Sequence, residues 1–102
     1  MDHDPNEPVN FRYDVVCIIS SPELSRKDVP KIREHILREC VGDCLVMGGM
    51  KGMIKVHFHT DNPEELFKVL EQYGKFESKA VEDMKKQYEE FKAKKEQEKE
   101  KK

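Results

Sequence analysis

Hydrophobic and polar positions alternate most regularly in MIKVHFHT, residues 53–60. Apolar residues occupy every second position, and the positions between them are Lys55, His57 and His59. A period of two predicts a strand with one apolar side packed on a core. The other side of this strand then carries both imidazoles.

Three further segments have the composition of strands. Residues 11–20, FRYDVVCIIS, form a nearly continuous apolar run, which predicts a central strand. Residues 44–49, CLVMGG, are joined to the alternating segment through GGMKG, whose glycines favour a tight hairpin. Residues 75–83, KFESKAVED, are expected to form a last short strand.

A helical period marks residues 25–40. Ser25 and Asp28 both have N-cap side chains, and Pro30 favours Asp28 because proline is tolerated in the first helical turn but not beyond it. Gly42 is predicted to end the helical region. His35 is expected on the exposed side of this helix. The apolar face consists of Val29, Ile32, Ile36 and Leu37.

The second helix is predicted over residues 61–74, DNPEELFKVLEQYG. Asn62 is the expected N-cap, Pro63 takes the first position, Glu65 completes a capping box and Gly74 stops the helix. The buried stripe is formed by Leu66, Val69, Leu70 and Tyr73.

A C-terminal helix docked along the domain is predicted from a narrow apolar stripe at helical spacing. Its members are Val81, Met84, Tyr88 and Phe91.

The order β-α-β-β-α-β followed by a helix predicts an α+β, ferredoxin-like sandwich with both inner helices on one face of the sheet. We expect a flexible leader at residues 1–10, one domain at 11–84 and a charged C-terminal helix or tail at 85–102. Met1 and the charged end favour a complete small protein.

Charge and composition exclude several classes of function. The net charge of −2 gives no basic field for nucleic acid, and no apolar run reaches the roughly 20 residues of a membrane span. The start of the chain is polar and acidic, unlike a secretory signal. An odd count of three cysteines then favours the reducing cytoplasm.

The two histidines are the main candidates for chemistry. His57 and His59 point the same way from one strand, as in many zinc sites, although two surface histidines on a half-exposed sheet are the simpler interpretation. Asp14 lies in the first strand, which a ferredoxin-like order puts beside the third. A carboxylate among apolar neighbours needs a partner, so Asp14, His57 and His59 are the predicted zinc ligands.

Cysteine offers a competing third ligand. Cys40 and Cys44 have a spacing compatible with zinc, but nothing places them on the histidine face. The favoured interpretation of all three cysteines, Cys17 included, is small buried apolar side chains. The glycines of GGMKG lack the length and the following helix of a phosphate-binding loop, so no kinase machinery is predicted.

Part of the sequence resembles a known family, the middle domain of the bacterial fatty acid kinase ATP-binding subunit (dihydroxyacetone-kinase-like proteins). The resemblance covers roughly residues 11–91. It is carried by a Gly-Asp start, the Lys-Val-His-x-His-Thr run, Asn-Pro, Tyr-Gly and Asp-Met, at Gly42, Asp43, residues 55–60, Asn62, Pro63, Tyr73, Gly74, Asp83 and Met84.

This resemblance implies an accessory role beside a DhaL-type kinase domain, which binds ATP and magnesium, and a DegV-like fatty-acid-binding protein. In the family the histidines matching His57 and His59 act with a cysteine, and a zinc site has been inferred for that trio. The family cysteine falls on Asp14 here, which leaves a carboxylate–histidine–histidine site as the option. Cys17, three residues on, is expected to face the opposite side of the sheet.

Three functions follow from these patterns. The first is a metal-binding accessory domain, which is not catalytic alone. The second is a small metal-dependent hydrolase that uses Asp14, His57 and His59. The third is a metal-free interaction module, and a homodimer through the sheet face or the C-terminal helix is expected.

Overall fold

A computed structural model describes residues 10–86 and 89–90. All of the predicted leader except Asn10, and much of the predicted tail, lie outside the described residues. The elements in chain order are β1 (Tyr13–Ser20), η1 (Arg26–Asp28), α1 (Val29–Glu39), β2 (Gly42–Met50), β3 (Met53–Thr60), α2 (Pro63–Leu70) and β4 (Lys75–Asp83).

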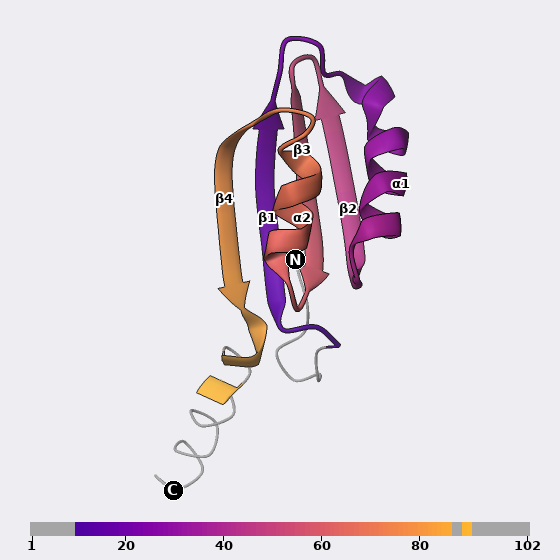
Figure 1. The fold of residues 1–102 in the computed structure, drawn as a ribbon. Coiled ribbons are helices and arrows are strands. Elements are labelled where there is room, and N and C mark those ends of the chain that lie inside the picture. Colours follow the sequence, from indigo (N-terminus) through magenta and orange to yellow (C-terminus); the bar gives the residue numbers. More distant parts are fainter. Residues whose placement is uncertain (1–9, 87–88, 91–102) are drawn as a thin grey trace, which may run out of the picture.

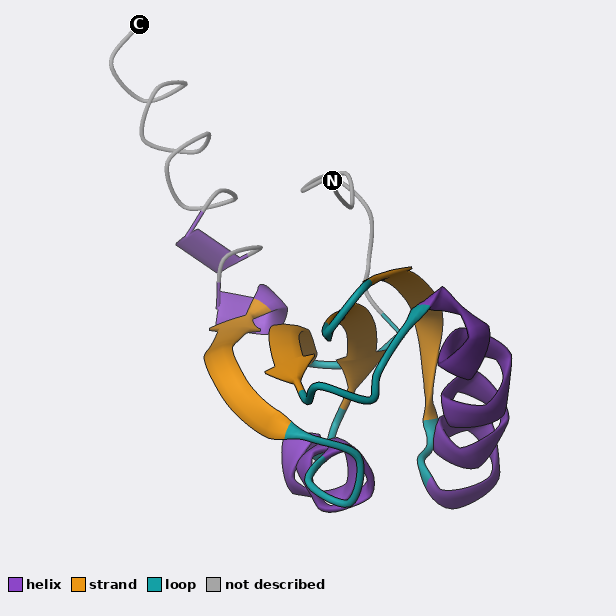
Figure 2. Ribbon diagram, turned by 90° about the horizontal axis from the view of Figure 1, so that it is seen from above, coloured by secondary structure: helices purple, strands orange, loops and turns teal. Residues whose placement is uncertain are grey.

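The strands form one antiparallel sheet in the order β2-β3-β1-β4, and α1 and α2 cover one of its faces (Figures 1 and 2). The first strand lies beside the third, as a ferredoxin-like order requires. The predicted α+β, ferredoxin-like sandwich is therefore confirmed.

Strand register decides which side chains face the helices. Val15 pairs with Phe58, and Cys17 pairs with Val56; all are fully buried. Directly paired residues of antiparallel strands share a face, so the alternate residues of β1 and β3 point to the opposite, open face. The core is completed by buried residues of the two helices, including Ile32, Ile36, Leu66 and Leu70.

The start of α1 resolves the competition between its two possible caps. The helix begins after Asp28, as predicted from Pro30, but Ser25 caps the preceding 3-10 turn. The Asp28 carboxylate accepts the backbone N–H of Ser25, so it completes that capping box and does not cap α1. The prediction that Leu37 belongs to the buried face was wrong, because its exposed fraction is 52%.

The second helix begins as expected but without the predicted capping box. Asn62 occupies the N-cap position and makes no side-chain cap hydrogen bond. The hydroxyl of Thr60 instead accepts the backbone N–H of Asn62 and donates to the carbonyl of Val41. A buried threonine at the end of β3 therefore ties this corner of the fold together.

The predicted C-terminal helix is present in part. Residues 84–86 and 89–90 are helical, and Met84 is fully buried. Val81 was wrongly assigned to the helix stripe: it lies in β4, pairs with Val15 and is 45% exposed. Tyr88 and Phe91 lie outside the described residues.

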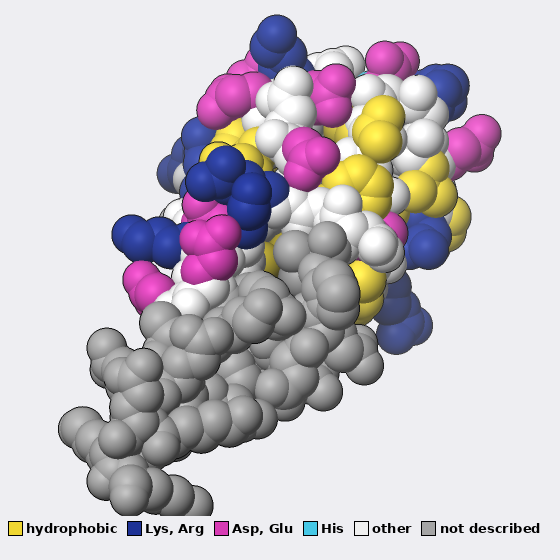
Figure 3. Space-filling model, turned by 90° about the horizontal axis from the view of Figure 1, so that it is seen from below, with side chains coloured by type: hydrophobic (Ala, Val, Ile, Leu, Met, Phe, Trp, Pro, Cys, Tyr) yellow, Lys and Arg dark blue, Asp and Glu magenta, His cyan; other side chains and the backbone are white. Residues whose placement is uncertain are grey.

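The surface among the described residues carries interspersed charge. On the side shown in Figure 3, basic and acidic side chains alternate with a few hydrophobic ones. No helix among the described residues is long and apolar enough to cross a membrane.

Gly42 serves a different purpose from the predicted helix stop. The helix ends at Glu39, Cys40 is its extended C-cap, and Gly42 opens β2, two residues earlier than the predicted strand. A Cβ at Gly42 would lie 2.2 Å from the carbonyl oxygen of His59 and 2.4 Å from the Phe58 ring. Glycine is therefore needed because β2 approaches β3 so closely.

We predict that Gly42→Ala destabilises the fold by about 1–3 kcal/mol or more, because the added methyl overlaps rigid backbone and a core ring. Gly48→Ala is the matched control in the same strand, since a Cβ there meets nothing within 4 Å. It should change the free energy of unfolding by less than about 1 kcal/mol. Urea unfolding measures both, and equal stability of the two variants would contradict the close approach.

Candidate metal centre

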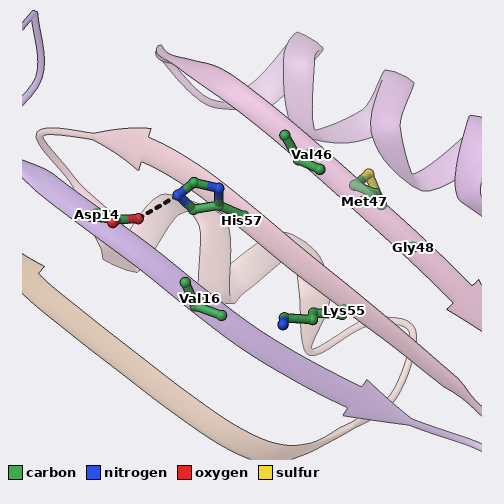
Figure 4. A pocket seen from close by; sticks show the side chains of 7 residues that line it. All are labelled: Asp14, Val16, Val46, Met47, Gly48, Lys55 and His57. Atoms are coloured by element: carbon green, nitrogen blue, oxygen red, sulfur yellow. Dashed lines mark ion pairs between the residues drawn. The ribbon is translucent and has the colours of Figure 1, made fainter. Parts of the chain in front are cut away.

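The open face of the sheet gathers the predicted metal ligands. Asp14 in β1 is paired with His59 in β3, and Val16 is paired with His57. Both imidazoles therefore project from the face opposite the helices, as predicted, and Asp14 lies on that face beside them (Figure 4).

The distances between the three side chains are those of one cluster. Nε2 of His57 lies 2.6 Å from Oδ1 of Asp14, and Nε2 of His59 lies 3.6 Å from the same oxygen. The imidazole ring centroids are 4.9 Å apart and the rings are nearly perpendicular, at 77°. One potential ligand atom from each of Asp14, His57 and His59 lies within 4.8 Å of the others.

These side chains are partly withdrawn from water. The side chains of His57 and Asp14 are 25% and 20% exposed, and that of His59 only 9%. A carboxylate so enclosed needs a favourable partner, because desolvation penalises its charge. His57 supplies one in this arrangement. A cation coordinated between the same atoms would supply a stronger one.

Asp43 is a neighbour that the sequence reasoning did not single out as a ligand. Oδ1 of Asp43 lies 3.7 Å from Nδ1 of His59, and Nδ2 of Asn10 donates to Oδ2 at 3.1 Å. Asp43 also pairs with His59 in the hairpin register. A two-strand alignment of the hairpin could have found it, had the bulge between them been foreseen.

Cys44 was wrongly interpreted as a small buried side chain. It lies in an irregularity of β2 between Asp43 and Val46, has a left-handed φ of 55° and is exposed. The bulge returns the next open-face residue to register, so that Val46 pairs with His57. Cys44, Asp43 and His59 form a second group of mutually close potential ligands.

The other two cysteines match the interpretation of buried apolar side chains. Cys17 and Cys40 are buried, and Cys17 faces the core. Burial raises the pKa of each thiol from 9.0 to about 11. Partial burial, followed by the charge of Asp43, also raises the pKa of the Cys44 thiol.

A shallow hollow of about 470 Å³ borders the cluster on the open face. Its floor is apolar, from Val16 and Val46, while Lys55 supplies a cationic end (Figure 4). The hollow gives solutes access to Asp14 and His57.

His35 lies in a different environment. It was expected to be exposed, but it is partly buried and its Nδ1 lies 2.6 Å from the hydroxyl of Tyr73. His35 comes from α1, whose contacts lie on the helical side of the sheet. It is thus separate from the candidate ligands, and His3 lies outside the described residues.

Comparison with known proteins gives one family. The family model that matches residues 10–91 describes the middle domain of proteins similar to the A-type subunit of fatty acid kinase. No curated protein matches the chain.

We predict that alkylation of the native protein modifies Cys44 roughly tenfold or more faster than Cys17 or Cys40. Exposure decides the order, and a pKa of about 11 further lowers the thiolate fraction of the two buried thiols. The rate at Cys44 should rise with pH over a range displaced upward from that of free cysteine, because its pKa is raised. Mass spectrometry of iodoacetamide-treated protein measures the order. Equal labelling of all three would contradict the assigned burial.

Proposed function

The chain belongs to the family of fatty acid kinase middle domains of the A-type, and we propose that it is an accessory domain that binds zinc through Asp14, His57 and His59. The observation that carries this proposal is the convergence of two imidazole nitrogens and one carboxylate oxygen within 4.8 Å on the open face. Imidazole and carboxylate are ordinary zinc ligands.

The spacing of the ligand atoms supports zinc. Ligand atoms of a tetrahedral site lie about 3.3–3.6 Å apart, given bonds of about 2.0–2.2 Å. The 3.6 Å between His59 and Asp14 is already in that range. The 2.6 Å between His57 and Asp14 has to open by roughly 0.7 Å, which a carboxylate rotation can supply.

Asp43 acts as a positioning residue in this proposal. When Nε2 of His59 coordinates a cation, its proton resides on Nδ1, which faces Oδ1 of Asp43 at 3.7 Å. A carboxylate behind a ligating imidazole fixes the ring and raises its basicity. Asn10 in turn holds the other oxygen of Asp43.

The accessory role follows from what the described residues offer. The open face presents ligands and a hollow, and the glycines of the hairpin form no phosphate-binding loop. We propose that phosphoryl transfer belongs to a DhaL-type kinase domain and fatty-acid binding to a DegV-like protein. Both are partners that the family resemblance implies. The three free cysteines fit a reducing, cytoplasmic setting.

A second candidate is self-association through the same face. Val46 and Met50 are 61% and 65% exposed on the open side of β2, beside the hollow. Exposed apolar residues gathered on one face favour contact with another protein surface. A homodimer would bury them and leave the helices free.

A third candidate, a small hydrolase, is favoured only by the access that the hollow gives to Asp14 and His57. Beyond the proposed ligands we assign no general base. Hydrolysis of generic phosphate or acyl esters by the zinc-loaded protein tests this candidate, and turnover that disappears with His57→Ala would replace the accessory role with an enzyme.

We predict that the purified protein binds about one zinc per chain, and that His57→Ala with His59→Ala abolishes this binding. Asp14→Ala should weaken it by roughly tenfold or more. His35→Ala is the matched control, since its ring contacts Tyr73 away from the cluster, and it should retain full zinc. Isothermal titration and elemental analysis give the result. Undiminished zinc in the double histidine variant would reject the site.

For self-association, we predict that light scattering of the concentrated protein gives a dimeric mass and that Val46→Glu with Met50→Glu returns it to a monomer. Charge introduced into an apolar contact is costly to desolvate. Leu37→Glu is the control, because Leu37 is similarly exposed but lies on α1. A monomeric mass of the unmodified protein would remove this candidate.

A further inference from the structure

We propose that Asp43, Cys44 and Nδ1 of His59 form a second cation site, distinct from the first cluster and specific for thiophilic cations such as Zn²⁺ or Cd²⁺. One ligand atom from each of these residues lies within 4.8 Å of the others. The two candidate sites share only His59.

The backbone at Cys44 is what brings the thiol to this position. In a regular hairpin, one residue would separate the open-face positions Asp43 and Val46, but two residues do. The extra residue bends β2 where Cys44 adopts a φ of 55°, a conformation uncommon for a residue with a Cβ. Bulges often redirect a side chain beside a functional site. Here the result is a thiol at the edge of the histidine cluster.

The donor set defines the kind of cation. A thiol, an imidazole and a carboxylate together suit zinc and other borderline or soft cations, whereas magnesium and calcium prefer oxygen ligands throughout. Three protein ligands leave the fourth position of a tetrahedral site to water. On binding, the sulfur–cation bond replaces the S–H bond and the proton passes to solvent.

His59 can serve this site without the first cluster. A neutral imidazole coordinates through one nitrogen and carries its proton on the other. When Nδ1 binds the second cation, Nε2–H faces Oδ1 of Asp14 at 3.6 Å. Asp14 then plays the part that Asp43 plays for the first site, and the second site does not depend on Asp14 or His57 as ligands.

The experiment uses Co²⁺ with the Asp14→Ala/His57→Ala variant, which lacks two ligands of the first cluster. Co²⁺ added to this variant should produce a thiolate-to-cobalt charge-transfer band in the near ultraviolet. The band should disappear when Cys44→Ser is added and persist when Cys40→Ala is added instead. These outcomes separate the two sites, because failure of the first cluster alone leaves the band intact.

A second measurement works on the unmodified chain. Zn²⁺ or Cd²⁺ in excess should slow alkylation of Cys44 roughly tenfold or more, and His59→Ala should remove the protection. The proposal is overturned if the double variant, folded by circular dichroism, gives no band. A band that survives Cys44→Ser overturns it as well. Alkylation of Cys44 that ignores the cation in the unmodified protein has the same consequence.

Discussion

The antiparallel register between β1 and β3 is the constraint on which the site depends. It pairs Asp14 with His59 and puts Val15 and Phe58 together in the core. A slip by one residue would turn the buried side chains of both strands toward water and the histidines toward the helices. The hydrophobic core therefore fixes the metal-ligand geometry, because the same register determines both faces.

The bulge in β2 adds a second layer to that arrangement. It shifts the hairpin register after Asp43, so that a carboxylate and a thiol reach His59 while the rest of the strand still pairs with β3. Gly42 makes the approach possible, since a side chain there would collide with the backbone of His59. Backbone irregularity and a required glycine thus occur together at the candidate centre, where function explains them better than stability does.

Much of this could be predicted from sequence, for identifiable reasons. The period of two in β3 determined the face of His57 and His59, and the order of elements placed Asp14 beside them. Asp43 and Cys44 were missed as partners because a bulge leaves no mark in hydrophobic periodicity. The capping box at Ser25 and the role of Thr60 were missed because several side chains compete locally for the same backbone N–H groups, and packing decides between them.

The resemblance to the family adds a chemical contrast. Where the family carries a cysteine, this chain has Asp14, and a cysteine occurs instead at Cys44, on the other side of His59. A carboxylate keeps a neutralising charge beside the histidines, while the thiol is moved to the bulge. The most direct test of the account is anomalous diffraction at the zinc edge from crystals grown with one equivalent of zinc. We expect one peak bounded by Asp14, His57 and Nε2 of His59. A peak elsewhere on the protein, or no peak in well-diffracting crystals, would contradict the account.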